Sequence, residues 1–367
     1  MSVNCGIVGL PNVGKSTLFN ALTATAAAQA ANFPFCTIEP NVGKVGVPDA
    51  RLERIAAIAG SAKVIPAQLE FVDIAGLVKG ASKGEGLGNQ FLSNIRETDA
   101  ILHVLRCFED EDITHVEGSV DPIRDAEVIE TELMLADLES IEKQIMNLQK
   151  KARGADKDAK AQLDLAERVR DALAEGRSAR TVEVAEDEKR AFKMLQLLTS
   201  KSVLYVCNVA ENDATNGNAW SEKVAAMATE QGAPSIVICA AIESEIAQLD
   251  DAEEKMEFLE TLGLEESGLD KIIKAGFKLL GLQTYFTAGP KEARAWTVRV
   301  GAKAPEAAGV IHSDFEKGFI KAEVIAFADY AAMNGEQGAK EAGKMRQEGK
   351  EYVVQDGDVI LFRCNQS

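Results

Sequence analysis

The chain has 367 residues, of which 46% are hydrophobic and 27% charged, which is typical of a globular protein of two or three domains. The formal net charge of -18 excludes a general nucleic-acid binder, because neutralising phosphates needs clustered lysines and arginines. No apolar run approaches the roughly 20 residues that span a bilayer, and no basic segment precedes an apolar one at the N-terminus. We therefore expect a cytoplasmic protein without a membrane partner, and a monomer by default.

The six cysteines are widely spaced and form no Cys-x-x-Cys pair. Several lie in apolar runs, which predicts buried free thiols in a reducing compartment. The alternative is a redox-sensing thiol, for which Cys36 is the candidate because it lies beside a predicted switch loop.

Short apolar runs alternate with helical stretches along the first part of the chain. Residues 15–28 are predicted to be a helix that follows a glycine-rich loop. Strands separated by helices predict an α/β fold with a mostly parallel sheet and helices on both faces. Ligands bind such sheets at the carboxyl ends of the strands. The predicted strands are residues 3–8, 70–74, 100–108, 202–208 and 235–240.

A heptad seam follows the third predicted strand and predicts a helical hairpin, an arm within residues 130–200. The alternative is two ordinary helices that lie on the sheet. Residues 143–180 hold ten basic and six acidic residues, a local net charge of +4 that offers an RNA-binding surface or a solvated helix face. The apolar positions are Met134, Leu138, Ile141, Ile145 and Leu148, then Leu165, Val169 and Ala172 across a turn at 154–157.

The pattern of predicted elements changes after about residue 282. Residues 294–300, 319–327 and 359–362 are predicted strands, and Gly-Pro and Ala-Pro pairs separate them. We predict a first domain over residues 1–281, interrupted by the arm, and a separate α+β domain over residues 282–367.

The glycine-rich loop reads Gly9-Leu10-Pro11-Asn12-Val13-Gly14-Lys15-Ser16, which is a P-loop. Its backbone N–H groups surround a β-phosphate, Lys15 reaches the β and γ oxygens, and Ser16 offers a hydroxyl to Mg²⁺. The following helix directs its N-terminal dipole at the same anion. Asn12 either helps to hold a monovalent cation or serves the loop's own hydrogen bonds. The predicted nucleotide-binding residues here are Asn12, Val13, Gly14, Lys15, Ser16 and Thr17.

Two further segments complete a predicted Mg·nucleotide switch. Asp73 begins an Asp-x-x-Gly motif after a strand, where it would hold the magnesium shell through water. Thr37 is the candidate for a switch-loop magnesium ligand. Five glycines in residues 76–88 indicate a mobile switch rather than a linker, and its candidate residues are Gly76, Leu77 and Gly80.

The order of these motifs and their amino-acid sequences resemble the YchF family of Obg-like ATPases over essentially the whole chain. The resemblance rests on Asn-Phe-Pro-Phe-Cys-Thr-Ile at 32–38 and Phe-Val-Asp-Ile-Ala-Gly-Leu-Val-Lys-Gly-Ala at 71–81. Two C-terminal segments agree, Leu-Gln-Thr-Tyr-Phe-Thr-Ala-Gly at 282–289 and Gly-Glu-Gln-Gly-Ala-Lys-Glu-Ala-Gly at 335–343. The family implies an Obg-type G domain with a helical arm, a C-terminal TGS domain, ATP hydrolysis and association with the ribosome, either the large subunit or the whole particle.

The stretch expected to recognise the base departs from ordinary GTPases. These use Asn-Lys-x-Asp, whose Asp accepts two N–H bonds from guanine. Here the stretch is Asn208-Val209-Ala210-Glu211, where Glu211 is one methylene longer and Val209 replaces the lysine. Losing a site built for guanine removes the penalty on adenine, so we expect ATP to bind at least as well as GTP. Asn208, Val209 and Glu211 are predicted to contact the nucleotide.

Hydrolysis requires a group that orients the attacking water, and the usual glutamine is replaced by Leu77. We therefore predict slow intrinsic turnover, with Lys15 as a catalytic residue. The family resemblance makes His115 the candidate for positioning water, whereas from the sequence alone it is a surface-loop histidine. His103 lies in a predicted strand and is expected in the core.

The resulting hypothesis is an ATP-driven switch that contacts ribosomal RNA or protein through the arm and the TGS domain. Two alternatives remain. One is a GTPase with an atypical base site. The other is a nucleotide-sensing scaffold or inhibitor whose turnover is incidental, which the absence of a glutamine at Leu77 favours.

Overall fold

The computed structural model describes residues 3–30, 41–74, 87–110, 118–153, 157–249 and 251–365. The chain divides into two compact units, residues 1–44 with 70–276, and residues 45–69 with 277–367. Within the described residues, each unit has a six-stranded sheet of its own. Among the described residues, no helix is both long and apolar enough to cross a membrane.

The sheet of the first unit has the order β2-β4-β1-β5-β6-β7. The pairs β1–β4, β1–β5, β5–β6 and β6–β7 are all parallel, as the alternation of strands and helices predicts. Every residue of β5 is buried, because helices cover both faces. The strands are β1 (Asn4–Val8), β2 (Val42–Gly46), β4 (Gln68–Asp73), β5 (Ala100–Cys107), β6 (Ser202–Val209) and β7 (Ser235–Ile238).

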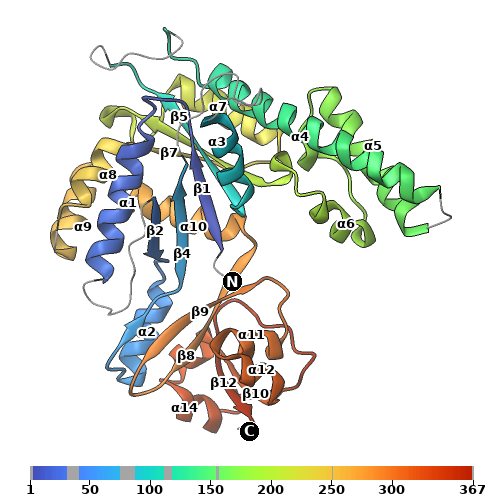
Figure 1. Ribbon diagram of the computed structural model, residues 1–367. Helices are drawn as coiled ribbons and strands as arrows, with labels where there is room; N and C mark the ends of the chain where they lie inside the picture. The colour runs from blue at the N-terminus through green and yellow to red at the C-terminus, as the bar shows by residue number, and fades with distance from the viewer. Residues whose placement is uncertain are drawn as a thin grey trace. The chain divides into compact units, whose positions relative to one another are not determined.

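Helices flank this sheet on both sides, with α1, α8 and α9 on one face and α3, α4 and α7 on the other (Figure 1). Because β1, β5, β6 and β7 run parallel, their carboxyl ends lie along one edge of the sheet, where the connecting loops meet. The helices of the unit are α1 (Lys15–Ala30), α3 (Leu87–Arg96), α4 (Pro122–Ala152), α5 (Lys157–Ala174), α6 (Lys189–Met194), α7 (Ala219–Glu230), α8 (Ala240–Ile246), α9 (Ala252–Thr261) and α10 (Gly268–Leu279).

The helices α4 and α5 form a hairpin that extends from the sheet, as the heptad seam predicts (Figure 1). Its apolar core includes Ile141 and Ile145 of α4 and Leu165 and Val169 of α5. The segment after α5 folds back against the pair and adds Leu195 and Leu197 to this core, which the sequence did not predict.

A buried carboxylate fastens the root of the hairpin to the strand β6. Asp137 of α4 is fully buried and accepts hydrogen bonds from the backbone N–H groups of Leu198 and Thr199 and from the Thr199 hydroxyl, at 2.7, 2.8 and 2.7 Å. These residues immediately precede β6. Burial raises the pKa of Asp137, and the hydrogen bonds from Thr199 and Leu198 oppose that shift.

The second unit has a mixed sheet of order β11-β10-β12-β8-β9-β3. Its core includes Tyr285, Val324 and Ile360. The strands are β3 (Val64–Ile65), β8 (Leu282–Ala288), β9 (Ala293–Arg299), β10 (Phe319–Ala326), β11 (Arg346–Glu348) and β12 (Asp358–Cys364). The helices are α2 (Ala50–Ala59), α11 (Ala304–Ile311), α12 (Ser313–Lys317), α13 (Phe327–Ala332) and α14 (Glu336–Glu341).

The predicted domain division at residue 282 is wrong for residues 45–69. These residues were predicted to belong to the first domain, but they belong to the second unit. The strand β3 pairs in parallel with β9, and Arg51 of α2 forms an ion pair with Asp356 at 2.8 Å. The Ser61 hydroxyl donates to the Gly289 carbonyl at 2.7 Å. All of these contacts are with residues more than 200 positions away, so no local pattern reveals them.

The described cysteines carry free thiols, as predicted. Cys5, Cys107, Cys207 and Cys239 are buried, and Cys364 is partly buried. Burial, together with the charge of Asp99, raises the pKa of Cys5 to about 12, so this thiol is inert. Cys36, the predicted redox candidate, lies outside the described residues.

Candidate nucleotide-binding site

The glycine-rich loop lies between β1 and α1, the arrangement that phosphate binding requires. Gly14 has a φ angle of 93°, a conformation that L side chains rarely adopt. A Cβ atom on Gly14 would lie 2.2 Å from the Nδ2 atom of Asn208, and one on Gly9 would lie 2.9 Å from the Val104 carbonyl oxygen. Both glycines are therefore needed to bring the loop this close to β5 and β6.

Asn208 connects the loop to two other segments of the site. Its side chain donates to the Val13 carbonyl at 2.9 Å and accepts from the Ala240 N–H at 2.9 Å. Only 4% of Asn208 is exposed. The amide thus joins the P-loop to the start of α8 across the end of β6, and both of its bonds lie in a buried setting where losing them is costly.

Lys15 and Asp73 form an ion pair at the ends of α1 and β4. Their side chains retain 10% and 20% exposure, so both remain accessible from the site. The Asp73 N–H donates to the Asn41 carbonyl at 2.8 Å, which fixes the end of the strand. Ser16 and Thr17 are exposed at the N-terminus of α1.

A large open cavity of about 940 Å³ lies over the carboxyl ends of the strands. The P-loop forms one side, and three strand ends form the other. Its lining combines residues 10–12 and 14–17 with residues 108–110, 208–212 and 239–241.

Most predicted nucleotide-binding residues meet in this cavity. Val13 is buried and contributes its carbonyl to Asn208 rather than a surface to the cavity. Thr37, Gly76, Leu77, Gly80 and His115 lie outside the described residues. The predicted residues that line the cavity are Asn12, Gly14, Lys15, Ser16, Thr17, Asn208, Val209 and Glu211.

Three groups of lining residues were not predicted from the sequence. These are Phe108, Glu109 and Asp110 after β5, Asn212 after β6, and residues 239–241 after β7. A usable signal was present, because these residues lie at or after the ends of predicted strands, where ligands bind in parallel sheets. The sequence predicted strands through residues 108 and 240, whereas β5 ends at Cys107 and β7 at Ile238. The residues beyond these ends are therefore free to line the cavity.

Asn218 holds the loops at this edge together. Its side chain donates to the Cys107 carbonyl at 2.8 Å and to the Asp213 carboxylate at 2.9 Å. It also accepts from the Trp220 and Ser221 N–H groups at 3.1 Å each, which caps α7. One polar residue outside every predicted motif thus joins the end of β5 to the segment after β6.

His103 lies inside β5 with 2% exposure, as expected of a core residue. Its ring is 5.6 Å from that of Tyr205 on β6. Burial, and secondarily the charge of Arg180, lowers the pKa of His103 from 6.5 to about 3, so it stays neutral at neutral pH.

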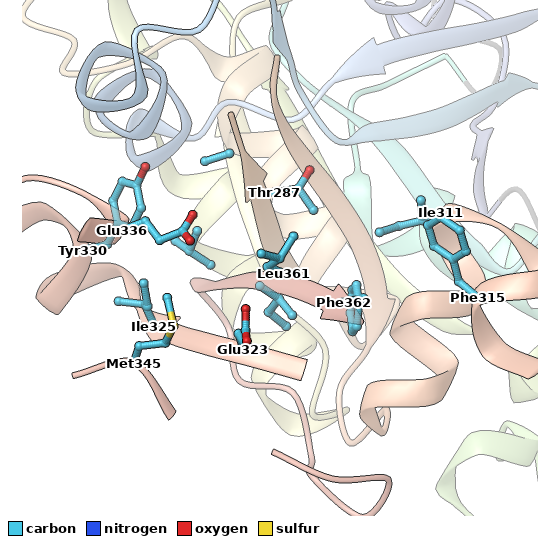
Figure 2. A pocket seen from close by; sticks show the side chains of 13 residues that line it. Thr287, Ile311, Phe315, Glu323, Ile325, Tyr330, Glu336, Met345, Leu361 and Phe362 are labelled. Carbon is cyan, nitrogen blue, oxygen red and sulfur yellow. The ribbon is translucent and has the colours of Figure 1, made fainter. Parts of the chain in front are cut away.

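A smaller cavity of about 190 Å³ lies in the second unit (Figure 2). Its walls are mainly apolar, with Ile311 and Phe315 on one side and Ile325, Met345 and Leu361 on the other. Its charged lining side chains are carboxylates, Glu323 and Glu336. Among the described residues no lysine or arginine lines it, so this cavity is unsuited to a polyphosphate.

The parallel sheet with the glycine-rich loop between β1 and α1 defines the first unit as a P-loop NTPase fold, which confirms the predicted fold class. A solved structure described as the Schizosaccharomyces pombe YchF GTPase superposes with a TM-score of 0.90 at 40% identity. The superposition covers 99% of this chain and 98% of that chain.

Family comparisons give a narrower assignment. Residues 4–151 match a family described as 50S ribosome-binding GTPase, and residues 282–365 match a YchF-GTPase C-terminal family described as a protein of unknown function (DUF933). The Ribosome-binding ATPase YchF of Haemophilus influenzae is 59% identical over 365 residues, with 100% of both chains covered. The protein of that name from Bacillus subtilis is 57% identical over 367 residues, again with 100% of both covered. The chain belongs to the YchF family.

Proposed function

We propose that this chain is a Mg²⁺-dependent ATPase that hydrolyses ATP to ADP and phosphate. One observation carries the proposal: a single cavity joins Lys15 and Ser16 of the P-loop to Val209 and Glu211. The names of related proteins include both ATPase and GTPase, so the preference for adenine or guanine has to be inferred from the residues of the site. We call residues 9–17 the phosphate end, and residues 108–110, 208–212 and 239–241 the nucleoside end.

The nucleoside end lacks the groups that select guanine. Val209 is 2% exposed and cannot lie along a base as a lysine stem does. Glu211 is exposed on the turn that follows β6, and its side chain is one methylene longer than the usual aspartate. The Asn208 amide is already bonded to Val13 and Ala240. These features support adenine, because a site without paired guanine partners carries no penalty for it.

The residues near the P-loop fit a magnesium ion that is completed by phosphates. Ser16 and Asp73 offer hydroxyl and carboxylate oxygens, the ligands that Mg²⁺ prefers. No cluster of three His, Cys, Asp or Glu side chains occurs in the described parts of the chain, so protein groups there do not form a closed metal site. We propose Ser16, Thr37 and, through water, Asp73 as the ligands. When bound, the ion neutralises charge on the β- and γ-phosphates.

Catalysis in this proposal comes from positioning and charge. Lys15 leaves its ion pair with Asp73 to meet the phosphate oxygens, and the backbone N–H groups of the loop stabilise the same anion. Because Leu77 cannot orient water, the attacking water needs another group, for which His115 is the candidate. We therefore expect slow turnover by the isolated protein.

Calorimetric titration with ATP and GTP, each with Mg²⁺, tests the nucleotide. We expect ATP to bind at least as tightly as GTP. GTP binding tenfold more tightly would mean that the nucleoside end recognises guanine by other groups, and that the chain is a GTPase with an atypical base site.

We further propose that the chain is a ribosome-associated switch, in which the first unit is a G domain that carries the arm at 130–200 and the second unit contains a TGS domain over residues 282–367. The names of its relatives support a ribosomal partner. Much of the basic charge on the arm is already paired: Arg168 with Glu188, Arg170 with Asp171, and Arg180 with Glu130. Because their charges are compensated, these paired residues add little net attraction to RNA.

The end of the α4–α5 hairpin is different, and we call Lys150, Lys151, Arg153 and Lys160 the tip cluster. All four are exposed, and none forms an ion pair with a residue that the structure describes. Four like charges at one end of a long hairpin form a local phosphate-binding surface on a protein whose net charge is otherwise strongly negative. The tip cluster is thus the favoured contact with ribosomal RNA.

Ribosome pelleting with the double variant Lys150→Glu/Lys151→Glu tests this contact. We expect much weaker, salt-sensitive binding with unchanged ATP turnover, because the tip cluster is separate from the cavity. The double variant Lys223→Glu/Lys278→Glu is the control for an equal change in net charge. Equal losses in both variants would point to bulk charge instead. If ribosomes do not accelerate turnover and a hydrolysis-dead variant retains function, the nucleotide-sensing scaffold is favoured.

A further inference from the structure

Arg106 is a buried arginine near the carboxyl end of β5. It is 2% exposed and is among the largest fully buried side chains of the chain. It pairs in register with Asn208 on β6, the residue that connects the P-loop to α8. A buried guanidinium requires hydrogen-bond partners, and those partners show what the residue does.

All described contacts of the Arg106 guanidinium are with the segment that follows β5. Its Nε donates to the Phe108 carbonyl at 3.1 Å, and its Nη2 donates to the Asp110 carbonyl at 3.4 Å. Its Cζ lies 4.6 Å from the centroid of the Phe108 ring. The guanidinium thus holds this segment by two backbone carbonyls and one aromatic face.

The segment held in this way is one wall of the cavity, formed by Phe108, Glu109 and Asp110. Arg106 itself is not part of the lining. Phe108 follows β5 directly, and the Asn218 bond to the Cys107 carbonyl also restrains the strand end from which the wall begins. The Nη1 atom is also buried and has no partner among the described residues.

We propose that Arg106 is a positioning residue that holds residues 108–110 as the nucleoside-side wall of the site, and thereby sets affinity for the nucleoside but not for the phosphates. This inference rests on the proposed function, because it assumes that the nucleoside lies at this end of the cavity. A lysine cannot replace the arginine, since an ammonium group lacks the planar fork that bonds two carbonyls while stacking on a ring.

The test compares a ligand with a nucleoside against one without. ATP and inorganic tripolyphosphate are titrated calorimetrically, with Mg²⁺, into the full-length protein and into Arg106→Lys, which keeps the charge and the long stem. We expect ATP affinity to fall about tenfold or more, as for a lost hydrogen bond to a charged group. Tripolyphosphate affinity should stay within about twofold of the wild type, because the P-loop is unchanged.

The control is His103→Leu, a change at another buried polar residue of the same strand that does not contact residues 108–110. It should leave the ratio of ATP to tripolyphosphate affinity unchanged. A double-mutant cycle with Phe108→Ala adds a second readout: if Arg106 acts through this wall, the two ATP losses are not additive.

Equal losses for both ligands in Arg106→Lys, or strictly additive losses in the cycle, would overturn the positioning role. Unchanged ATP affinity would overturn it as well. Failure of the wild-type protein to bind either ligand would instead overturn the proposed function, so the two failures are distinguishable.

Discussion

At the phosphate end of the cavity the chain supplies its groups from consecutive residues, 9–17, whereas at the nucleoside end they come from segments that begin at residues 108, 208 and 239. In the proposed function, the difference follows from the ligand groups that each end would recognise. Phosphate is bound by backbone N–H groups and one lysine, which a short loop provides once glycines let it turn. A base and ribose need side chains placed around a flat ligand, and only neighbouring strand ends place them.

Asn208 is where the two ends meet, because its amide bonds to the P-loop on one side and to the start of α8 on the other. We therefore expect the largest effect from a change at the phosphate end, a smaller one at the residue that joins both ends, and the smallest in the strands beneath the nucleoside end.

Removing the lysine of the phosphate end should have the largest effect. Lys15→Ala should lower ATP turnover by about 10²- to 10³-fold, because one charge-stabilising donor is lost from the reacting phosphates. Affinity for ATP and for tripolyphosphate should fall by similar factors, measured by phosphate release and calorimetry. Lys44→Ala, at a lysine paired with Glu70 at 2.9 Å on the neighbouring strands, is the control and should leave both unchanged. A loss for ATP alone would show that Lys15 also serves the nucleoside.

Substituting the joining residue should damage both ends and the fold. Asn208→Ala leaves the Val13 carbonyl and the Ala240 N–H without their partner, which costs about 1–3 kcal/mol for each group. We expect a lower unfolding free energy in urea and weaker binding of ATP, GTP and tripolyphosphate alike. Asn212→Ala, an exposed residue of the same cavity, is the comparison and should retain stability. A loss of affinity for ATP alone would mean that the Asn208 amide contacts the base directly.

Acid should weaken the strands beneath the nucleoside end through His103. The pKa of this residue is about 3 in the folded protein against 6.5 for an unperturbed histidine, so below pH 6.5 the unfolded chain binds a proton that the folded chain does not. Its contribution to stability is present above pH 6.5 and is lost as the pH falls toward 3. Between pH 7 and pH 5 it should cost about 2 kcal/mol of unfolding free energy.

The measurement is urea unfolding at pH 7 and pH 5, with and without His103→Leu. A Trp296→Phe background leaves Trp220 as the only tryptophan, which restricts the signal to the first unit. On acidification, the protein that retains His103 should lose about 2 kcal/mol more unfolding free energy than the His103→Leu variant. Equal losses in both would assign the acid sensitivity to other groups.

The fold of the first unit was readable because its signals are local. Apolar runs separated by helical stretches predicted the parallel strands, and the glycine-rich loop marked the junction of β1 and α1. The seam from Met134 to Leu148 predicted the hairpin because helix pairing repeats every seven residues. The segments β3 and α2 were assigned to the wrong unit, since their partners on β9 and near Asp356 lie more than 200 residues away.

For the site, the sequence by itself determined the glycine-rich loop, the Asn208–Glu211 stretch and the family resemblance, because each depends on residue types at fixed short spacing. Only the tertiary structure decided that the Asn208 amide forms hydrogen bonds with Val13 and Ala240, that Phe108 to Asp110 form a wall of the cavity, and that Arg106 contacts this wall. Those facts depend on which strands are neighbours and where each one ends. A parallel sheet brings these distant positions to one edge, and no spacing along the chain records it.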